Sequence, residues 1–459
     1  MNGKSLHIKS FGCQMNKLDT ALVTSALKES GFVLTDVVAD ADVVLINTCS
    51  VRQHAEQRVL SHLGHLKHIK ETRPDMVVGV IGCMAQRLGA ELLKHAAVDL
   101  VCGPGQIPQI VKMLEKTMAE KEKMLAVAEK IRQEDVKNED LENFEAVYDS
   151  DDKQLSNQAF VRVMRGCNKF CTYCIVPYVR GAEACRSPKV IIEQIRRLAD
   201  RGVKLVTLLG QTVNSYKYSA GEKLYSLADL LYMANEVEGI EWVRFVTSYP
   251  MAEFYDEILK AMTGCEKVCK YLHLPAQSGS DRILKAMNRH YTAGQYLEMI
   301  ERAREIVPQV QMAGDFIVGF PGETDEDFAQ TIQLVERAKY KNCFVFKYSP
   351  RPGTTADKRL QDDVAQEVKK KKNIELLAVQ SRISDELSRG FLGQTVKVLV
   401  EGLSKKPHLD AKNGGNVQLV GRTAEDWIVV FEGRESMAGQ FAAVKITRTS
   451  PLTLFGNLA

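Results

Sequence analysis

The sequence lacks the features that mark membrane proteins, secreted proteins and proteins that coat nucleic acids. None of its uncharged apolar runs approaches the ~20 residues that a membrane-spanning helix needs, so we expect no membrane integration. The first residues, MNGKSLHIKS, contain no apolar stretch of the kind that signal peptides have. The net charge of +3 is too small to indicate a nucleic-acid partner by itself, so any RNA assignment has to come from motifs.

What remains is the composition of an ordinary soluble protein. With 459 residues, of which 45% are hydrophobic and 26% charged, the chain is long enough for about three domains. Its 11 cysteines are an odd number, and without a signal peptide they do not indicate a disulfide framework. We therefore expect a reducing, cytoplasmic location.

Three of the cysteines stand close together. Cys167, Cys171 and Cys174 lie in the string RGCNKFCTYCIVPYVRG. Thiolates ligate iron–sulfur clusters, and three of them leave one iron of a four-iron cubane open to the amino and carboxylate groups of a small molecule. A zinc ribbon needs two cysteine pairs a dozen or more residues apart, and here there is one group. The spacing therefore favours an iron–sulfur cluster over zinc.

The first hundred residues alternate between apolar strands and amphipathic helical segments. Strands are predicted at residues 6–11, 41–47 and 75–82. Each is closely followed by a cysteine, namely Cys13, Cys49 and Cys83. The alternation predicts an open parallel sheet of the Rossmann or flavodoxin type, whose strands share one edge at their carboxyl ends, so the three thiols should converge and hold a second cluster. Buried cysteines that cap core strands are the alternative.

Beyond a stretch rich in Lys, Glu and Asp from about Lys116 to Gln158, the strand–helix alternation resumes six times. Strands are predicted at residues 159–165, 203–210, 242–248, 270–276, 311–320 and 343–349. Six such units predict a partial (β/α)6 barrel. The loop with Cys167 follows the first of these strands, at the end where barrel enzymes gather their chemistry.

The C-terminal part changes character again. Short strands with Gly turns are predicted at residues 394–402, 415–422, 426–433 and 440–449, which indicates a small β-barrel. The basic run Lys369–Lys372 lies in a helix before this barrel and is interpreted as a solvated helix face. Charge and aromatic residues alone permit RNA binding by this barrel without demanding it.

These motifs resemble one family over nearly the whole chain, the radical SAM methylthiotransferases, and within it the MiaB-type branch that modifies tRNA. FGCQMNKLDT, NTCSVRQHAE and GCMAQR resemble the three cysteine motifs of its N-terminal domain, and the string around Cys167 resembles its cluster loop. LGQTVNSY, HLPAQSGSDRILKAMNRHYT and DFIVGFPGET resemble later barrel strands, and the C-terminal segment resembles a TRAM domain, a small OB-like RNA-binding barrel.

The resemblance implies a domain division and two [4Fe–4S] clusters. The expected domains are residues 4–120 for the N-terminal domain, 121–152 for a linker, 153–385 for the radical SAM core and 388–450 for the TRAM domain. The expected ligands are Cys13, Cys49 and Cys83 for the auxiliary cluster, and Cys167, Cys171 and Cys174 for the cluster that binds S-adenosylmethionine.

The resemblance also implies an activity and partners. The expected reaction is methylthiolation of carbon 2 of N6-isopentenyladenosine next to the anticodon of tRNA. S-adenosylmethionine would serve as methyl donor and as source of a 5′-deoxyadenosyl radical, with sulfur supplied at the auxiliary cluster. Besides tRNA, the enzyme would need an electron donor and a sulfur or cluster donor, and we expect a monomer.

Contacts to S-adenosylmethionine are expected from the barrel. Tyr173, Ile317 and Gly319 would lie near the adenosine, and Gln211, Ser248 and Gln277 nearer the ribose and the methionyl group. Glu183 and Arg186 are candidates for the charged methionyl end. For the polar residues a structural role at strand ends is the alternative, and for Glu183 and Arg186 the alternative is a surface ion pair.

Related substrates are the competing interpretation, either an aspartate of a ribosomal protein or threonylcarbamoyl-adenosine in tRNA. Gln14–Asn16 together with Ser50–Arg52 favours the MiaB-type branch. Thr20, Cys185 and Tyr249 stand where the family more often has Ser, Ser and His, and these departures leave the cluster ligands intact. The remote alternative is a non-catalytic iron–sulfur protein that binds RNA and senses redox state.

Overall fold

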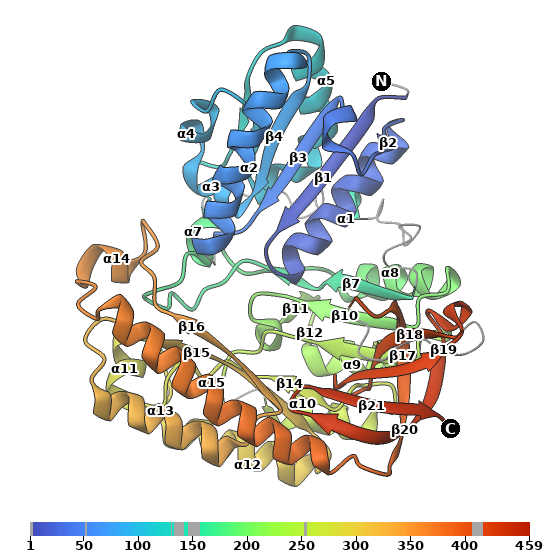
Figure 1. The fold of residues 1–459 in the computed structure, drawn as a ribbon, viewed down its shortest axis with the longest axis vertical. Coiled ribbons are helices and arrows are strands. Elements are labelled where there is room, and N and C mark those ends of the chain that lie inside the picture. Colours follow the sequence, from blue (N-terminus) through green and yellow to red (C-terminus); the bar gives the residue numbers. More distant parts are fainter. Residues whose placement is uncertain are drawn as a thin grey trace.

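The computed structural model describes residues 3–50, 53–129, 131–132, 142–145, 157–251, 255–405 and 416–459. Val51 and Arg52, two of the residues that favour the MiaB-type branch, lie outside these ranges. None of the helices in the described ranges has the length and apolar character that crossing a membrane requires. The chain forms an N-terminal α/β domain above a larger body that consists of a partial barrel and a small closed barrel (Figure 1).

The N-terminal domain is a six-stranded sheet in the order β2-β1-β3-β4-β5-β6, in which every pairing is parallel. Its strands are β1 (Ser5–Phe11), β2 (Val33–Leu34), β3 (Val43–Thr48), β4 (Val77–Gly82), β5 (Leu100–Cys102) and β6 (Met124–Ala126). Its main helices are α1 (Gln14–Glu29), α2 (Gln53–Thr72), α3 (Cys83–Leu88), α4 (Ala90–Leu93) and α5 (Ile110–Glu120). The order matches the flavodoxin type, so the expected fold is confirmed, and β6 extends the sheet into the range expected as linker.

Apolar β-branched sequences explain the central strands of this domain. Every residue of β3 and of β4 is buried, as expected for strands covered by helices on both faces. The strand order reverses between β1 and β3, which is where ligands bind in open α/β sheets. The cysteines after these two strands therefore stand at the topological switch point.

The central domain contains two three-stranded parallel sheets. One has the order β13-β10-β7 and the other the order β14-β15-β16, and a parallel bridge pairs Val243 of β13 with Val268. The strands are β7 (Gln158–Arg162), β10 (Leu205–Leu209), β13 (Trp242–Phe245), β14 (Tyr271–His273), β15 (Gln311–Val318) and β16 (Asn342–Lys347). All six lie inside or within one residue of the predicted ranges, and the partial (β/α)6 barrel is confirmed.

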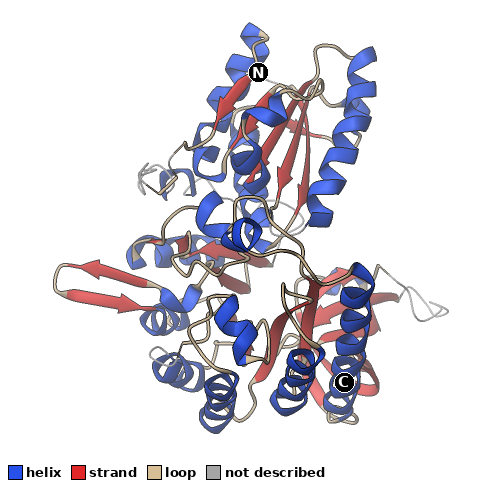
Figure 2. Cartoon of the chain, turned by 90° about the vertical axis from the view of Figure 1, so that its left-hand side faces the viewer, coloured by secondary structure: helices blue, strands red, loops and turns tan. Residues whose placement is uncertain are grey.

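Helices cover the outside of this partial barrel (Figure 1). They are α8 (Pro188–Asp200), α9 (Leu227–Asn235), α10 (Tyr255–Gly264), α11 (Asp281–Ala286), α12 (Ala293–Ile306) and α13 (Asp325–Ala338). Shorter elements are α7 (Val176–Val179), α14 (Thr355–Arg359) and the strand pair β8 (Met164–Arg165) and β9 (Ala184–Cys185). An antiparallel hairpin of β11 (Lys217–Ala220) and β12 (Lys223–Ser226) projects from the body (Figure 2).

The basic run before the C-terminal domain lies in α15 (Gln366–Arg389), and two of its four lysines are buried. Lys369 Nζ lies 2.5 Å from Asp362 Oδ1, and Lys372 Nζ lies 3.2 Å from Glu323 Oε2. The prediction of a solvated helix face is therefore wrong for Lys369 and Lys372. Their long stems cross the apolar surface of the barrel before the ammonium groups reach carboxylates.

The C-terminal domain is a closed five-stranded barrel in the order β17-β18-β19-β21-β20. Its strands are β17 (Thr395–Leu403), β18 (Val417–Arg422), β19 (Ile428–Gly433), β20 (Phe441–Ser450) and β21 (Thr453–Leu458). The small OB-like barrel is thus confirmed. Sequence reasoning missed β21, which lies beyond the expected end at residue 450 and closes the barrel by pairing parallel to β19 and antiparallel to β20.

Asp426 joins the small barrel to the open barrel. Its carboxylate lies 2.9 Å from Arg244, 3.5 Å from Lys341 and 3.1 Å from Arg422. Arg244 and Lys341 belong to the open barrel and are almost fully buried, so each depends on Asp426 for an ionic partner. Both tryptophans of the chain lie at this junction, Trp427 next to Asp426 and Trp242 with its ring 4.8 Å from that of Phe441.

Replacing Asp426 by Ala should destabilise this junction by about 3 kcal/mol, because it leaves two buried cations without their anion. Tryptophan fluorescence reports the junction directly. The unfolding midpoint of Asp426→Ala, followed by this fluorescence, should therefore move to a lower urea concentration. Glu336 pairs with Arg382 on the exposed surface, and Glu336→Ala should cost less than about 1 kcal/mol. Equal shifts for the two variants would contradict the junction described here.

Candidate functional site

Three cysteines line the carboxyl edge of the N-terminal sheet. Cys13 directly precedes α1 after β1, Cys49 follows β3, and Cys83 is the first residue of α3 after β4. A hydrogen bond with Cys49 and the nearby positive charge of Arg180 lower the pKa of Cys13 to about 6. The thiols of Cys13 and Cys49 are thus in contact, and the environment favours a thiolate, which is the form that binds metal.

Glycines and amides fix the turns that carry these thiols. A Cβ on Gly12 would lie 2.7 Å from Cys49 Cβ, and one on Gly82, at φ +95°, would lie 2.6 Å from the carbonyl oxygen of Thr48. Asn16 donates to Asn47 Oδ1 at 3.0 Å and to the Thr48 carbonyl at 2.8 Å, which ties the first turn to the second. The close backbone approach therefore requires glycine before both Cys13 and Cys83.

Ser50 supports the presence of a ligand at this edge. Its hydroxyl, next to Cys49, is fully buried and has no hydrogen-bond partner among the described residues. A buried hydroxyl without a partner costs free energy unless something accepts or donates a hydrogen bond there. A polar or ionic group held by the three thiols would supply that partner.

Arg180 approaches the same edge from the barrel domain. Its Nε donates to Cys83 Sγ at 3.2 Å, and its Nη2 donates to Asp19 Oδ2 at 2.8 Å. Asp19 belongs to α1, and its other oxygen accepts from Arg162 of β7 at 2.5 Å. A buried network of charges therefore connects the cysteine edge of the N-terminal domain to the first strand of the barrel.

The second cysteine group lies in the loop between β8 and α7. Cys167 and Cys171 are buried and Cys174 is half-buried. Burial raises the pKa of Cys167 to about 11, so a thiolate there needs the positive charge of bound iron. Arg289 lies 3.4 Å from Cys171 Sγ and places a fixed positive charge beside this thiol.

Gly166 holds the start of this loop. At φ +72°, a Cβ on Gly166 would lie 1.9 Å from the carbonyl oxygen of Ala182 and 2.7 Å from that of Gly181. The backbone N–H of Cys167 donates to the Gly181 carbonyl at 3.1 Å. The cluster loop is thus folded tightly against the segment that follows it, with no room for a side chain.

Three of the expected cofactor residues, Tyr173, Gln277 and Ile317, lie near one another in the barrel domain. Tyr173 and Ile317 both pack against the small core that includes Ile283 and Phe320. The N–H of Ile317 donates to the carbonyl of Gln277 at 2.9 Å, and Gln277 has the strained φ of +74°. Strain of this kind concentrates at ligand sites, where the surrounding structure holds it.

Two expected polar contacts are buried and unsatisfied. Ser248 Oγ and Gln211 Oε1 have no hydrogen-bond partner among the described residues. Ser248 lies after β13 and Gln211 after β10, so both face the end of the barrel at which the cluster loop lies. They fit the ribose or methionyl groups of a bound cofactor, and their binding roles stay predictions.

The two charged candidates differ in their surroundings. Glu183 Oε1 accepts from the backbone N–H of Asn168 at 3.2 Å and from the Thr212 hydroxyl at 2.9 Å, beside the cluster loop. Arg186 is buried, donates to the carbonyl of Arg162 at 2.6 Å and lies 2.7 Å from Glu145 Oε2. Arg186 is therefore part of the charge network between the domains, and its contact with the methionyl end stays a prediction.

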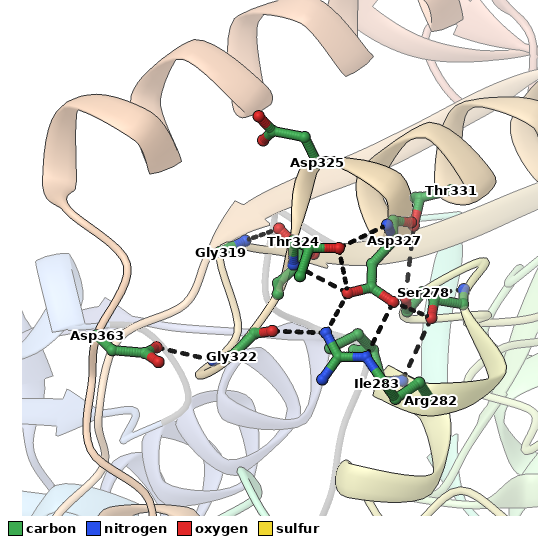
Figure 3. A network of polar contacts seen from close by, with 12 residues as sticks. Ser278, Arg282, Ile283, Gly319, Gly322, Thr324, Asp325, Asp327, Thr331 and Asp363 are labelled. Carbon is green, nitrogen blue, oxygen red and sulfur yellow. Dashed lines mark hydrogen bonds and ion pairs between the residues drawn. The ribbon is translucent and has the colours of Figure 1, made fainter.

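Asp327 organises the loops that carry Gln277 and Gly319 (Figure 3). It accepts from Ser280 at 2.6 Å and from Thr324 at 2.9 Å, and it pairs with Arg282, which also donates to the carbonyl of Gly322 at 2.6 Å. Hydrogen bonds from Arg282, Ser280 and Thr324 outweigh burial and hold the pKa of this carboxyl well below its ordinary value. Asp327 therefore stays charged and links the loops after β14 and β15.

The donor set fits iron–sulfur clusters better than a single metal ion. No group of three or more His, Cys, Asp or Glu side chains in the described part of the chain is arranged to hold one ion. A cluster spreads its thiolate ligands over separate iron atoms, so its ligands need not surround one point. Two groups of three thiols, one spread over three strand ends and the other in a single loop, satisfy that requirement beside buried arginines.

Sequence reasoning missed the arginines that contact the thiols. Arg180 and Arg289 lie in strings that were noted for other reasons, VPYVRG and MNRHYT. A basic residue a few positions from a cysteine motif was the available signal, but it does not tell which thiol the guanidinium reaches. Arg180 in fact contacts Cys83, which is 97 residues away in the sequence.

Three family models match the three domains. The Radical SAM superfamily matches residues 161–335, Uncharacterized protein family UPF0004 matches residues 5–103, and the TRAM domain matches residues 389–459. The matched ranges agree with the N-terminal sheet, the partial barrel and the closed small barrel.

Curated relatives match over the full length. A tRNA-2-methylthio-N(6)-dimethylallyladenosine synthase of Rhodopirellula baltica is 44% identical, covering 99% of this chain and 95% of the relative. Proteins of the same name from Thermoanaerobacter sp. and Clostridioides difficile are 41% and 40% identical and cover 99% of this chain, with 93% and 91% of their own lengths covered.

Among solved structures, the radical S-adenosylmethionine methyltransferase TsrM from Kitasatospora setae is similar in fold. The form with cobalamin and a [4Fe–4S] cluster bound has a TM-score of 0.55 at 14% identity, covering 78% of this chain and 77% of that chain. The form with tryptophan and a cofactor analogue bound has a TM-score of 0.53 at 14% identity, covering 75% and 73%. At this identity the likeness shows the fold alone.

Gly166→Ala should prevent cluster formation at the second cysteine group, because the added carbon meets two carbonyl oxygens. Iron in anaerobically reconstituted protein should fall from about eight to about four atoms per chain. Gly202→Ala is the matched control, since Gly202 has φ +90° and open space around it. That variant should keep its iron. Full iron content in Gly166→Ala would contradict the packing of the cluster loop.

Proposed function

Because this chain belongs to the tRNA-2-methylthio-N(6)-dimethylallyladenosine synthase family, we propose that it methylthiolates carbon 2 of N6-isopentenyladenosine next to the anticodon of tRNA. The observation that carries the proposal is the placement of six cysteines in two groups of three, joined by one buried charge network. A protein that only senses redox state has no need for two such groups at a barrel mouth.

In this proposal, Cys13, Cys49 and Cys83 hold the auxiliary cluster, and Cys167, Cys171 and Cys174 hold the cluster that binds S-adenosylmethionine. When bound, the clusters and S-adenosylmethionine supply a 5′-deoxyadenosyl radical, a sulfur atom and a methyl group.

The chain's own residues orient and enclose the cofactor. Tyr173 and Ile317 offer an apolar surface for the adenine, and Gly319 directly follows β15 with its N–H donated to Glu323 Oε2 at 2.7 Å. Ser248 and Gln211 offer their unsatisfied polar atoms to the ribose and methionyl groups. Gln277 presents its strained backbone beside Ile317, and Glu183 offers a carboxylate beside the cluster loop.

The RNA substrate suits this architecture. The target base lies in the anticodon loop, where it is unpaired, so turning it out of the stack costs less than extracting a paired base. The closed barrel after α15 would hold the tRNA backbone while the base reaches the space between the two cysteine groups. The competing substrates lose support, because the curated relatives at 40–44% identity carry one name throughout.

The enzyme would also need partner proteins. A cytoplasmic monomer would receive electrons from a donor protein and sulfur from a sulfur or cluster donor. Its functional division keeps the auxiliary site in the N-terminal domain, the cofactor site in residues 153–385 and the RNA-binding barrel from residue 388 onward.

Two cysteine substitutions separate the roles of the two groups. Cys171→Ala should abolish formation of 5′-deoxyadenosine, because it removes a ligand of the cluster that binds S-adenosylmethionine. Cys13→Ala should leave that product measurable and stop methylthiolation. The assay uses reconstituted enzyme, reductant, S-adenosylmethionine and an isopentenylated anticodon stem-loop RNA, with both products followed by mass spectrometry.

Cys265 provides a matched control for these variants. It is buried in the barrel core away from both cysteine groups, and Cys265→Ala should retain both products. If Cys13→Ala or Cys171→Ala still methylthiolated the RNA, the assignment of two clusters would fail.

A further inference from the structure

The segment after the cluster loop touches both cysteine groups at once. The Gly181 carbonyl accepts from the backbone N–H of Cys167, and the neighbouring Arg180 donates from its side chain to Cys83 Sγ at 3.2 Å. Gly181 has φ +79°, a conformation that favours glycine. This turn directs the Arg180 side chain toward Cys83 and the Gly181 carbonyl toward Cys167. Two consecutive residues thus connect the ligands of two clusters.

The side chain of Arg180 is held in place by burial and by its ionic partner. Its side chain is 6% exposed, and Asp19, which accepts from its Nη2, is 1% exposed. Asp19 in turn pairs with Arg162, so one carboxylate lies between two guanidinium groups. These contacts therefore fix the position and the orientation of the Arg180 guanidinium before any cluster is bound.

The buried network around Arg180 carries more positive than negative side chains. The network contains the cations Arg162, Arg180 and Arg186 and the anions Asp19 and Glu145, all buried, which sum to +3 − 2 = +1. Buried charges in proteins are paired. Arg180 brings this excess of positive charge to Cys83 Sγ, which its Nε reaches at 3.2 Å.

We propose that Arg180 is the positioning residue that couples the two clusters, by donating a charge-assisted hydrogen bond to the Cys83 thiolate while its backbone neighbour anchors the loop of Cys167. The inference deepens the proposed function and rests on it, because it assigns one cluster to each cysteine group. Arg180 has two effects. It fixes the auxiliary cluster relative to the cofactor cluster, and it raises the reduction potential of the auxiliary cluster.

The reduction potential is tested with the auxiliary cluster alone. In a Cys171→Ala background, redox titration followed by electron paramagnetic resonance measures that cluster. Adding Arg180→Met should lower the fraction reduced at a fixed potential, with the ratio of reduced to oxidised cluster falling about tenfold or more, as expected for loss of a charge-assisted hydrogen bond. Arg162→Met is the matched control, since Arg162 pairs with the same Asp19 and reaches no thiol in the described contacts.

The coupling is tested in the otherwise unchanged enzyme. With isopentenylated stem-loop RNA, Arg180→Met should still form 5′-deoxyadenosine, but methylthiolated RNA per 5′-deoxyadenosine should fall about 10- to 100-fold. Arg162→Met weakens the same Asp19 contact without removing a hydrogen bond to a thiol, so it should lower this ratio much less than Arg180→Met does. Arg180→Lys, which keeps the charge but cannot reach Cys83 and Asp19 as a fork, should give intermediate values.

Several outcomes would overturn the inference. Equal behaviour of Arg180→Met and Arg162→Met would mean that Arg180 acts only in packing the two domains together. If Arg180→Met does not fold, Arg180→Lys serves instead. An unchanged reduction potential and an unchanged product ratio in that variant would show that the guanidinium is not needed to bridge Cys83 and Asp19. Failure of the proposed function is seen separately, because it appears in the unchanged protein as about four iron atoms per chain or no methylthiolation.

Discussion

One buried carboxylate determines how the two halves of this molecule face each other. Asp19 on α1 accepts from Arg162 of β7 and from Arg180 behind the cluster loop, and hardly any of its side chain reaches solvent. Taking three charges out of water is costly unless their geometry is fixed, so the contact tolerates little displacement of one domain against the other. The positions of both cysteine groups follow from it.

The topology of the two domains makes this contact useful. The flavodoxin-type sheet brings Cys13 and Cys49 together at its switch point, and the barrel places the loop of Cys167 at the carboxyl ends of its strands. Each domain thus presents its reactive edge to the other. At the far end of the open barrel, Asp426 anchors the small closed barrel through Arg244 and Lys341. Buried ion pairs therefore set both domain junctions.

Much of this arrangement could be predicted from the sequence, because it depends on periodicity and spacing. Three strands of the N-terminal sheet and the convergence of Cys13 with Cys49 follow from apolar runs that end near a cysteine. The parallel pairing and the six barrel strands follow from the alternation of strands and helices. Family resemblance added the cofactors and the substrate, which no periodicity reveals. The resemblance was specific because its motifs cover nearly the whole chain.

The rest depended on contacts between residues that are distant in the sequence. Lys372 looked like a solvated residue because a run of four lysines usually is, yet its partner Glu323 lies 49 residues earlier. Lys369 pairs with Asp362, only seven residues away, but the basic run does not reveal that this lysine is buried. The pairing of Arg186 with Glu145 in the charge network was likewise not foreseen, because Glu145 lies 41 residues earlier in the sequence. The strand β21 was missed because its six residues include Gly456 and Asn457, which are weak strand formers, although it pairs with the adjacent β20 as well as with β19. Local sequence does not encode such partners.

The central claim is that both clusters face one shared space across the Asp19 contact. Electron paramagnetic resonance of the enzyme with both clusters reduced tests it most directly. We expect signals broadened by magnetic interaction between the clusters, and the broadening should vanish when Cys13→Ala removes one of them. A spectrum equal to the sum of the two clusters measured separately would contradict the arrangement.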